Sequence, residues 1–210
     1  MTPRLAPVLS RRDLPEAELY AARLDGEVFA IDECFCPVDE IEQRTHRARA
    51  LAAILPARLI AEQRTAAWVL GVLDRPPARH QLCADAGARA RPPSTARMTV
   101  REVVIDDSEL LSYAGMRVTT PLRTALDLAR FSTDFGPDER SLIERLAALG
   151  SFGLAECRTA LEKRRNLPGK RLALHRFRSA LVTSRPAGAS ARRVSAIDEV
   201  VAAGDKTGSV

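Results

Sequence analysis

Asp106, Asp107 and Glu109 form a short acidic group that could hold a metal ion. Nucleotidyl transfer or nuclease chemistry needs carboxylates that strands hold around Mg²⁺. The neighbouring predicted strand, residues 98–105, has Glu102 as its only carboxylate ligand. The sequence also lacks a G-x-x-x-x-G-K-[ST] phosphate loop, a G-x-S-x-G elbow and an H-E-x-x-H zinc motif. We therefore interpret the group as a solvated turn, with metal binding as the alternative, and predict that the chain is not an enzyme.

Sulfur and imidazole side chains do not follow the spacing of a zinc site. Zinc ligands usually come as pairs separated by two to five residues, and no such pair is found here. We predict reduced, partly buried thiols, no metal and no cofactor. His46 and His80 are expected to be ordinary surface or edge residues. The four cysteines are Cys34, Cys36, Cys83 and Cys157.

Arginine dominates the positive charge of the chain. All but three of the 32 basic side chains are arginine, the net charge is +5 and the pI is about 9.4. Such a composition is typical of GC-rich genomes, but the arginine fork also binds phosphates and carboxylates, so a nucleic acid or an acidic protein partner is compatible. The run Lys163-Arg164-Arg165 ends a predicted helix, where cations suit the helix dipole; partner binding is the alternative.

The segment from Val118 to Arg130 predicts the end of a strand followed by a capped helix. Pro121 suits the first helical position, and Thr120 precedes it as a capping residue. One face of the predicted helix is apolar and consists of Leu122, Ala125, Leu126 and Ala129. Arg123 and Asp127 are one turn apart on the opposite face.

The first part of the chain predicts a helix and a β-hairpin. A helix over residues 14–24, with Ser10 as a possible cap, is followed by the Asp25-Gly26 turn. Strands are expected over 27–31 and 34–36, with a tight turn between them. A helix followed by a hairpin is the second half of a winged helix-turn-helix.

The remainder predicts a small sheet packed with helices, which places the chain in the α+β class. Helices are expected over 38–56, 63–73, 138–149, 154–166 and 170–182, and strands over 79–84, 98–105 and 115–119, with a turn over 106–111. The first of these helices should present Ile41, Ala48, Leu51, Ala52 and Leu55 on one face. The expected core contains Trp68, Leu70, Leu122, Leu126, Leu142 and Leu146.

Membrane insertion and export are not indicated. The sequence contains no apolar run of the roughly 18–20 residues that span a bilayer, and its N-terminus has no long apolar segment of a signal peptide. We therefore expect a cytoplasmic protein that does not bind a membrane.

Two motifs resemble the core of a known family. The segments Arg64-Thr-Ala-Ala-Trp-Val-Leu-Gly71 and Val118-Thr-Thr-Pro-Leu-Arg123 are similar to those of AbiEi-type antitoxins of type IV toxin–antitoxin systems, which are common in actinobacteria. The chain resembles a short form without a nuclease-like C-terminal domain. The order of Ser10-Arg-Arg12, Leu14, Leu19, Gly26, Val28, Phe35 and Pro37 also fits the winged module of the family.

The resemblance implies transcriptional regulation together with opposition to a nucleotidyltransferase-like toxin, without a stable complex being required. Promoter DNA would be bound by Arg11, Arg12 and Arg23 together with the wing at 27–36, because a winged helix inserts its second helix into the major groove. A degenerate protein-interaction scaffold that does not bind DNA is the alternative. Candidate partner-binding residues are Arg44, Arg47, Lys163, Arg164 and Arg165.

The expected organisation has three parts. Residues 1–37 form a partial winged-helix module, residues 38–182 form an α+β antitoxin-like body with a helical C-terminal part, and residues 183–210 form a disordered tail. The tail is expected because its composition shifts to Ala, Gly, Ser and Arg.

Overall fold

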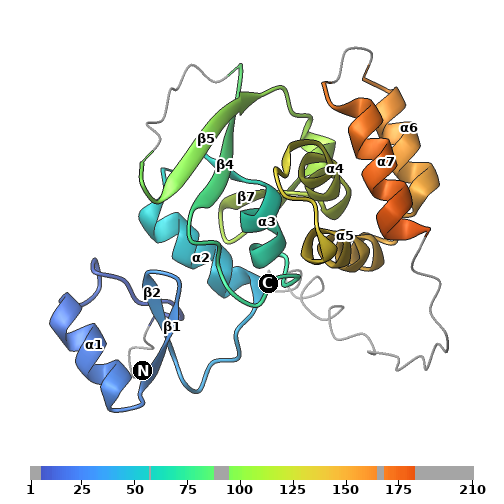
Figure 1. Cartoon of the computed structure of the whole chain (residues 1–210). Helices are drawn as coiled ribbons and strands as arrows, with labels where there is room; N and C mark the ends of the chain where they lie inside the picture. Colours follow the sequence, from blue (N-terminus) through green and yellow to red (C-terminus); the bar gives the residue numbers. More distant parts are fainter. Residues whose placement is uncertain (1–5, 57, 88–94, 165–167, 183–210) are drawn as a thin grey trace, which may run out of the picture.

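A helix and a two-stranded hairpin open the part of the chain that the structure describes. The computed structural model describes residues 6–56, 58–87, 95–164 and 168–182. Helix α1 (Glu16–Leu24) leads into the antiparallel strands β1 (Val28–Ile31) and β2 (Cys34–Pro37). This confirms the predicted helix and hairpin. We call residues 6–37 the N-terminal unit; it lies at one end of the molecule (Figure 1).

The N-terminal unit has a small apolar core of its own. Leu9, Leu19, Val28 and Phe35 are buried together. Leu9 and Phe35 also form two backbone hydrogen bonds with each other, of 2.7 and 2.9 Å, which pair the segment before α1 with β2. The opposite face of the hairpin, with Ile31, Cys34 and Cys36, belongs to the main core instead.

The expected capping role of Ser10 is wrong. Helix α1 begins at Glu16, and Pro15 occupies its N-cap position. Ser10 instead donates its backbone N–H and its hydroxyl to the carboxylate of Asp13, each at 2.8 Å. The residues from Ser10 to Asp13 therefore form a tight turn before the helix.

Helix α2 (Arg44–Ile54) is shorter than the predicted 38–56 helix. Its start is fixed by a capping box, in which the ring Nδ1 of His46 accepts the backbone N–H of Gln43 at 3.1 Å. Ile41 therefore lies outside the helix and is 80% exposed. Ala52 is also exposed, whereas Ala48 and Leu51 are buried as expected.

Among the described residues, five short strands form one sheet with the order β5-β4-β3-β7-β6. Strands β4 (His80–Asp85), β5 (Met98–Val103) and β7 (Met116–Thr119) correspond to the predicted strands. The sequence did not indicate β3 (Ile60–Ala61), which joins β4 and β7, or β6 (Leu110–Tyr113), which follows the single turn η1 (Asp107–Glu109). Pairing is parallel for β4–β5 and β3–β7 and antiparallel for β3–β4 and β6–β7.

Helices pack beside this sheet and complete the main core. Helix α3 (Gln63–Val69) lies between the sheet and α4 (Pro121–Phe131), and α5 (Pro137–Gly150), α6 (Leu154–Glu162) and α7 (Lys170–Leu181) cover α4 from the other side (Figure 1). No helix in the described ranges is long and apolar enough to cross a membrane. The expected core is confirmed, with Trp68, Leu70, Leu126, Leu142 and Leu146 buried and Leu122 partly buried against them.

Helix α4 is surrounded by protein on almost every side. The hydroxyl of Thr120 accepts the backbone N–H of Arg123 at 3.3 Å, which confirms the predicted cap with Pro121 behind it. Arg123 and Asp127, expected on the face opposite the apolar one, are 3% and 0% exposed. This face is buried although it is polar, and its partners include Arg101 of β5 and Glu109 of η1. Polar residues at these positions therefore need partners inside the protein.

Candidate functional site

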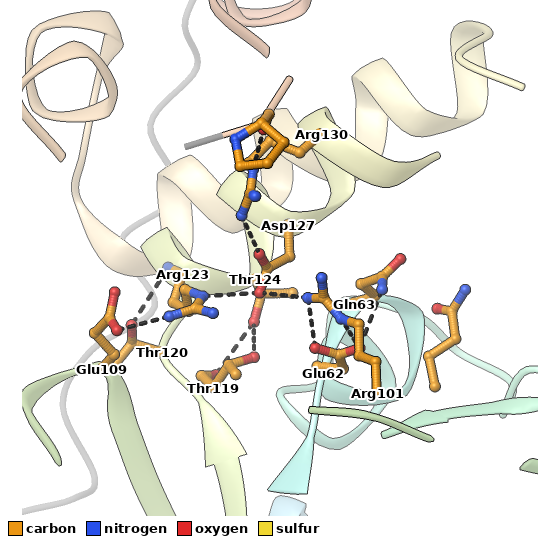
Figure 2. Close-up of polar contacts among 12 residues, drawn as sticks. Glu62, Gln63, Arg101, Glu109, Thr119, Thr120, Arg123, Thr124, Asp127 and Arg130 are labelled. Atoms are coloured by element: carbon orange, nitrogen blue, oxygen red, sulfur yellow. Dashed lines mark hydrogen bonds and ion pairs between the residues drawn. The ribbon is translucent and has the colours of Figure 1, made fainter. Parts of the chain in front are cut away.

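Asp127 is the centre of a buried network of ion pairs. Its Oδ2 atom accepts Arg123 Nε at 2.8 Å and lies 3.1 Å from Arg101 Nη2, while its Oδ1 atom accepts Arg130 Nη1 at 3.3 Å. Figure 2 shows these three guanidinium groups converging on one carboxylate. We call the following residues the arginine network: Glu62, Arg101, Glu109, Arg123, Asp127, Arg130 and Arg164.

Two further carboxylates extend the arginine network on either side. Arg101 forms a bidentate ion pair with Glu62, with Nε–Oε1 and Nη2–Oε2 distances of 2.6 Å each. At the other end, Oε2 of Glu109 accepts Arg123 Nη1 at 2.6 Å and also accepts Arg164 Nη2. The planar fork of arginine explains the first pair, because its two parallel N–H groups match the two carboxylate oxygens.

The elements that carry these residues are distant in sequence. Glu62 directly precedes α3, Arg101 is on β5, and Glu109 ends η1. Arg123, Asp127 and Arg130 recur on one face of α4 at positions i, i+4 and i+7. The joint between β7 and α4 is held by a 2.7 Å hydrogen bond between the hydroxyls of Thr119 and Thr124, so the face of α4 has a fixed orientation toward the sheet.

Positive charge exceeds negative charge within the arginine network, which contains four guanidinium groups and three carboxylates. Burial raises the pKa of Glu62 above its ordinary value, although the hydrogen bonds and charge of Arg101 oppose this rise. Burial lowers the pKa of Arg130; Asp127 opposes the shift, and repulsion from Arg101 and Arg123 adds to it. The lowered pKa of Arg130 reflects its burial first and the repulsion from neighbouring arginines second.

An open hollow of about 610 Å³ lies beside the arginine network. We call it the basin. The centres of the guanidinium groups of Arg101 and Arg130 lie 4.1 and 4.4 Å from the centroid of the Phe131 ring, so both form cation–π contacts at its wall. Its lining residues are Arg101, Glu102, Val103, Val104, Ile105, Asp106, Arg123, Arg130, Phe131 and Arg164.

The predicted acidic turn is only partly a solvated turn. Asp106 and Asp107 are exposed, and Asp106 accepts the backbone N–H of Ser108 at 2.9 Å. Glu109 instead belongs to the arginine network, so its interpretation as a solvated residue is wrong. In the part of the chain that the structure describes, no group of three or more His, Cys, Asp or Glu residues could hold a metal ion.

The three predicted DNA-binding arginines are exposed on the N-terminal unit. Arg11 forms an ion pair with Glu16 at 2.8 Å, and Arg11 and Arg23 line one small hollow. The turn of the hairpin is not free. Asp32 contacts His80 Nε2 at 2.9 Å and Arg97 Nη2 at 3.1 Å, and Arg97 Nε donates to Glu33 at 2.9 Å. These bonds attach the tip of the expected wing to the sheet.

The predicted partner-binding residues are divided between two places. Arg44 donates to the carbonyl of Leu70 at 3.1 Å, and Arg47 donates to the carbonyls of Trp68 and Leu73 at 2.6 and 2.7 Å. Both guanidinium groups therefore stabilise the end of α3. Lys163 is exposed just beyond α6, Arg164 joins the arginine network, and Arg165 lies outside the described residues.

Two interpretations of single residues need correction. His46 and His80, expected at the surface or at an edge, are both buried. His46 is held in the capping box of α2, and His80 lies between Asp32 and Thr65, with a 3.4 Å ring contact to the Thr65 hydroxyl. The predicted free thiols are confirmed, and Cys34, Cys36, Cys83 and Cys157 are all buried.

Sequence reasoning missed three members of the arginine network and did not predict that its members come together. Glu62, Arg101 and Arg130 were not singled out, although Arg123 and Asp127 were noted as a pair. One signal was present in the sequence: Arg123, Asp127 and Arg130 recur on a single face of a helix that also carries an apolar face. Glu62 and Arg101 are 39 positions apart, and no local pattern indicates their contact.

Comparisons with known proteins bear on the same part of the chain. Residues 51–147 match the family model described as the AbiEi antitoxin C-terminal domain. Among solved structures, the RV2827C protein from Mycobacterium tuberculosis is 17% identical, with a TM-score of 0.44, over 85% of this chain and 72% of that chain. No curated protein matches the chain. The matched residues include the whole sheet, α3, α4 and every member of the arginine network except Arg164, so this part of the chain is similar to an AbiEi-type antitoxin domain.

Proposed function

We propose that this protein is the antitoxin of a type IV toxin–antitoxin system and opposes a nucleotidyltransferase-like toxin in the cytoplasm. The observation that carries the proposal is the match of residues 51–147 to an antitoxin domain, because this stretch contains the sheet and the residues that orient α4 toward it. The family is one of antitoxins rather than of known enzymes, and we propose that the protein acts by binding and not by catalysis.

The surface proposed to act on the toxin is basic. Lys163 is exposed at the end of α6, next to Arg164 at the rim of the basin, and Arg165 follows in sequence. Arg44 and Arg47 line a second hollow of about 480 Å³. Positive charge at such places favours the approach of an acidic protein surface and raises the association rate, even where the complex is short-lived.

Growth rescue tests the antitoxin proposal. A nucleotidyltransferase-like toxin encoded beside this gene is induced in a host cell, with or without this protein expressed from a second plasmid. We expect the protein to restore growth. The variant Lys163→Glu should weaken the rescue, whereas Arg158→Glu, which reverses an exposed charge within α6, should not. Growth that stays arrested although the protein is present would contradict the proposal.

Promoter binding through Arg11, Arg12 and Arg23 is proposed as a second activity. In favour of it, all three arginines are exposed on the N-terminal unit, and Arg11 and Arg23 face one hollow. The same unit contains seven acidic residues, which repel a phosphate backbone. Any DNA contact therefore depends on α1 and these arginines rather than on the tip of the hairpin.

A salt titration of binding to the DNA upstream of the gene tests this second activity. Each phosphate contact contributes a slope of about −0.9 in the logarithm of affinity against the logarithm of salt concentration. Replacing Arg11 and Arg12 together by alanine should therefore flatten the slope by about two units. If the unmodified protein shows no salt-sensitive binding, the interaction-scaffold function replaces that of the regulator.

A further inference from the structure

The basin collects guanidinium groups from separate elements around one hollow. Arg101 comes from β5, Arg123 and Arg130 come from α4, and Arg164 follows α6. All three carboxylates of the arginine network are already engaged by these arginines. The lining also contains the carboxylates of Glu102 and Asp106, so guanidinium groups outnumber carboxylates in the lining by four to two.

We propose that the basin binds a nucleoside phosphate, with its phosphate group held by the arginine wall. This inference is independent of the antitoxin and DNA-binding proposals, because it concerns a small ligand. The two halves of the proposal, phosphate and nucleoside, rest on different parts of the lining.

The arginine wall favours phosphate over a single carboxylate. Arginine forks donate pairs of N–H groups in one plane, and a phosphate group offers several oxygens to more than one fork at once. The hydrogen bonds described for Arg164 use only Nη2, and those for Arg130 use Nε and Nη1. Among the described residues, no hydrogen bond given for either side chain uses its remaining N–H groups, which can donate to a ligand. The lowered pKa of Arg130 agrees, since an added anion would offset its repulsion from Arg101 and Arg123.

The rest of the lining favours a nucleoside attached to the phosphate. Val103, Val104 and Phe131 give one wall an apolar surface, and the Phe131 side chain is exposed. Because Arg101 and Arg130 already lie over the Phe131 ring, a base would pack against the exposed edge of this wall or stack on a guanidinium plane. The volume of about 610 Å³ falls in the range of roughly 300–1,000 Å³ that is typical of small-molecule sites.

A purely structural role for the arginines is the competing explanation. In that case the arginine network would only join α4 to β5 and η1, and the basin would take no ligand. The two explanations differ in a simple observable: only a binding site distinguishes a nucleotide from the same nucleoside without its phosphate.

Calorimetric titration of the full-length protein tests the proposal. The probes are AMP, GMP, CMP and UMP, with adenosine and inorganic phosphate as the two partial ligands. We expect at least one nucleotide to bind about tenfold or more tightly than inorganic phosphate, and adenosine to bind too weakly to detect. Equal affinity for phosphate and all four nucleotides would overturn the nucleoside half, and binding of none of the probes would overturn the whole proposal.

Matched variants assign the binding to the basin. Arg164→Gln removes a half-buried guanidinium of the wall and should weaken nucleotide binding about tenfold, since a charged hydrogen bond to the ligand is lost. Arg164→Lys keeps the charge without the fork and should weaken it less. The control Arg158→Gln changes the net charge equally at an exposed position outside the basin and should leave binding unchanged. Thermal melting of each variant confirms that it is folded, and equal affinities of Arg164→Gln and Arg158→Gln would refute the assignment.

Discussion

In the N-terminal unit, acidic side chains outnumber basic ones and lie mostly at the surface, whereas in residues 51–147, which we call the antitoxin domain, Arg123 and Arg130 lie in the interior. The unit contains seven acidic and three basic residues, and Asp32 is the acidic one with a buried side chain. In the antitoxin domain, Arg123 and Asp127 are almost completely enclosed. A charge in water is easily replaced, but an enclosed charge depends on its partner. The two regions should therefore respond very differently to the loss of a charge.

The largest effect is expected from Asp127→Ala. This change removes the common partner of Arg101, Arg123 and Arg130 and leaves their positive charges together inside the protein. Breaking a buried pair in this way costs about 3–5 kcal/mol. Urea denaturation of the variant measures the loss. The control Asp107→Ala, at an exposed position of η1, should change stability by less than about 0.5 kcal/mol.

Leu126→Ala tests the apolar side of the same helix. Leu126 is buried in the main core, and truncating a buried leucine costs about 2–5 kcal/mol. The melting temperature should fall by several degrees, as measured by circular dichroism. Leu24→Ala makes the same change at the end of α1, where the side chain is 89% exposed, and should leave the melting curve almost unmoved. Equal shifts for both variants would show that α4 is peripheral.

Arg97→Ala should have a smaller effect, of about 1 kcal/mol, because the Arg97 side chain is half exposed and its pairs are screened by water. His80 still holds Asp32 in this variant. Hydrogen exchange should show faster exchange in the hairpin and unchanged exchange in α4. Uniform acceleration over the whole chain would instead indicate that the contact at the hairpin tip supports the entire fold.

The smallest effect at neutral pH concerns the thiols. Burial raises the pKa of Cys34 to about 11 and the pKa of Cys36 to about 12, with nearby carboxylates adding to both. In the unfolded chain these thiols lose their protons near a pKa of about 9, so above pH 9 the unfolded state binds fewer protons than the folded one. Stability should therefore be unaffected at pH 7 and should fall as pH rises from 9 to 11.

Replacing both cysteines by alanine provides the control for this pH dependence. The double variant loses some packing at every pH, but its stability should decline less steeply between pH 9 and 11 than that of the parent protein. Urea denaturation at several pH values compares the two slopes. Parallel slopes would assign the alkaline decline to other groups.

Local signals predicted those parts of the fold that local interactions determine. Thr120 and Pro121 indicated where α4 begins, and the spacing of Leu122 and Leu126 indicated its apolar face, because caps and periodicity depend only on neighbours along the chain. The two-residue strand β3 escaped prediction because it is too short to show alternation and is defined by pairing with β4 and β7.

The candidate site was less predictable because its contacts join distant segments. Arg123 and Asp127 lie one turn apart, so their pairing could be proposed from sequence. Their burial could not, since it depends on segments that are distant in the sequence, among them β5 with Arg101 and η1 with Glu109. His80 was misjudged for the same reason: the residue that encloses it, Asp32, is 48 positions away on the N-terminal unit.

The hairpin of the N-terminal unit contributes one face to each of the two cores, and this has a consequence for how the protein can be divided. Ile31, Cys34 and Cys36 pack into the main core, and the Cys34 thiol contacts the carbonyl of Ala50 on α2 at 3.7 Å. The family match begins at residue 51, inside α2, and ends at 147, before α6 and α7. The segment that matches the family model and the part of the chain that packs into one core thus begin and end at different residues. A fragment cut at the family borders would expose apolar surface at both ends and should aggregate, so experiments on the antitoxin domain need residues 6–182.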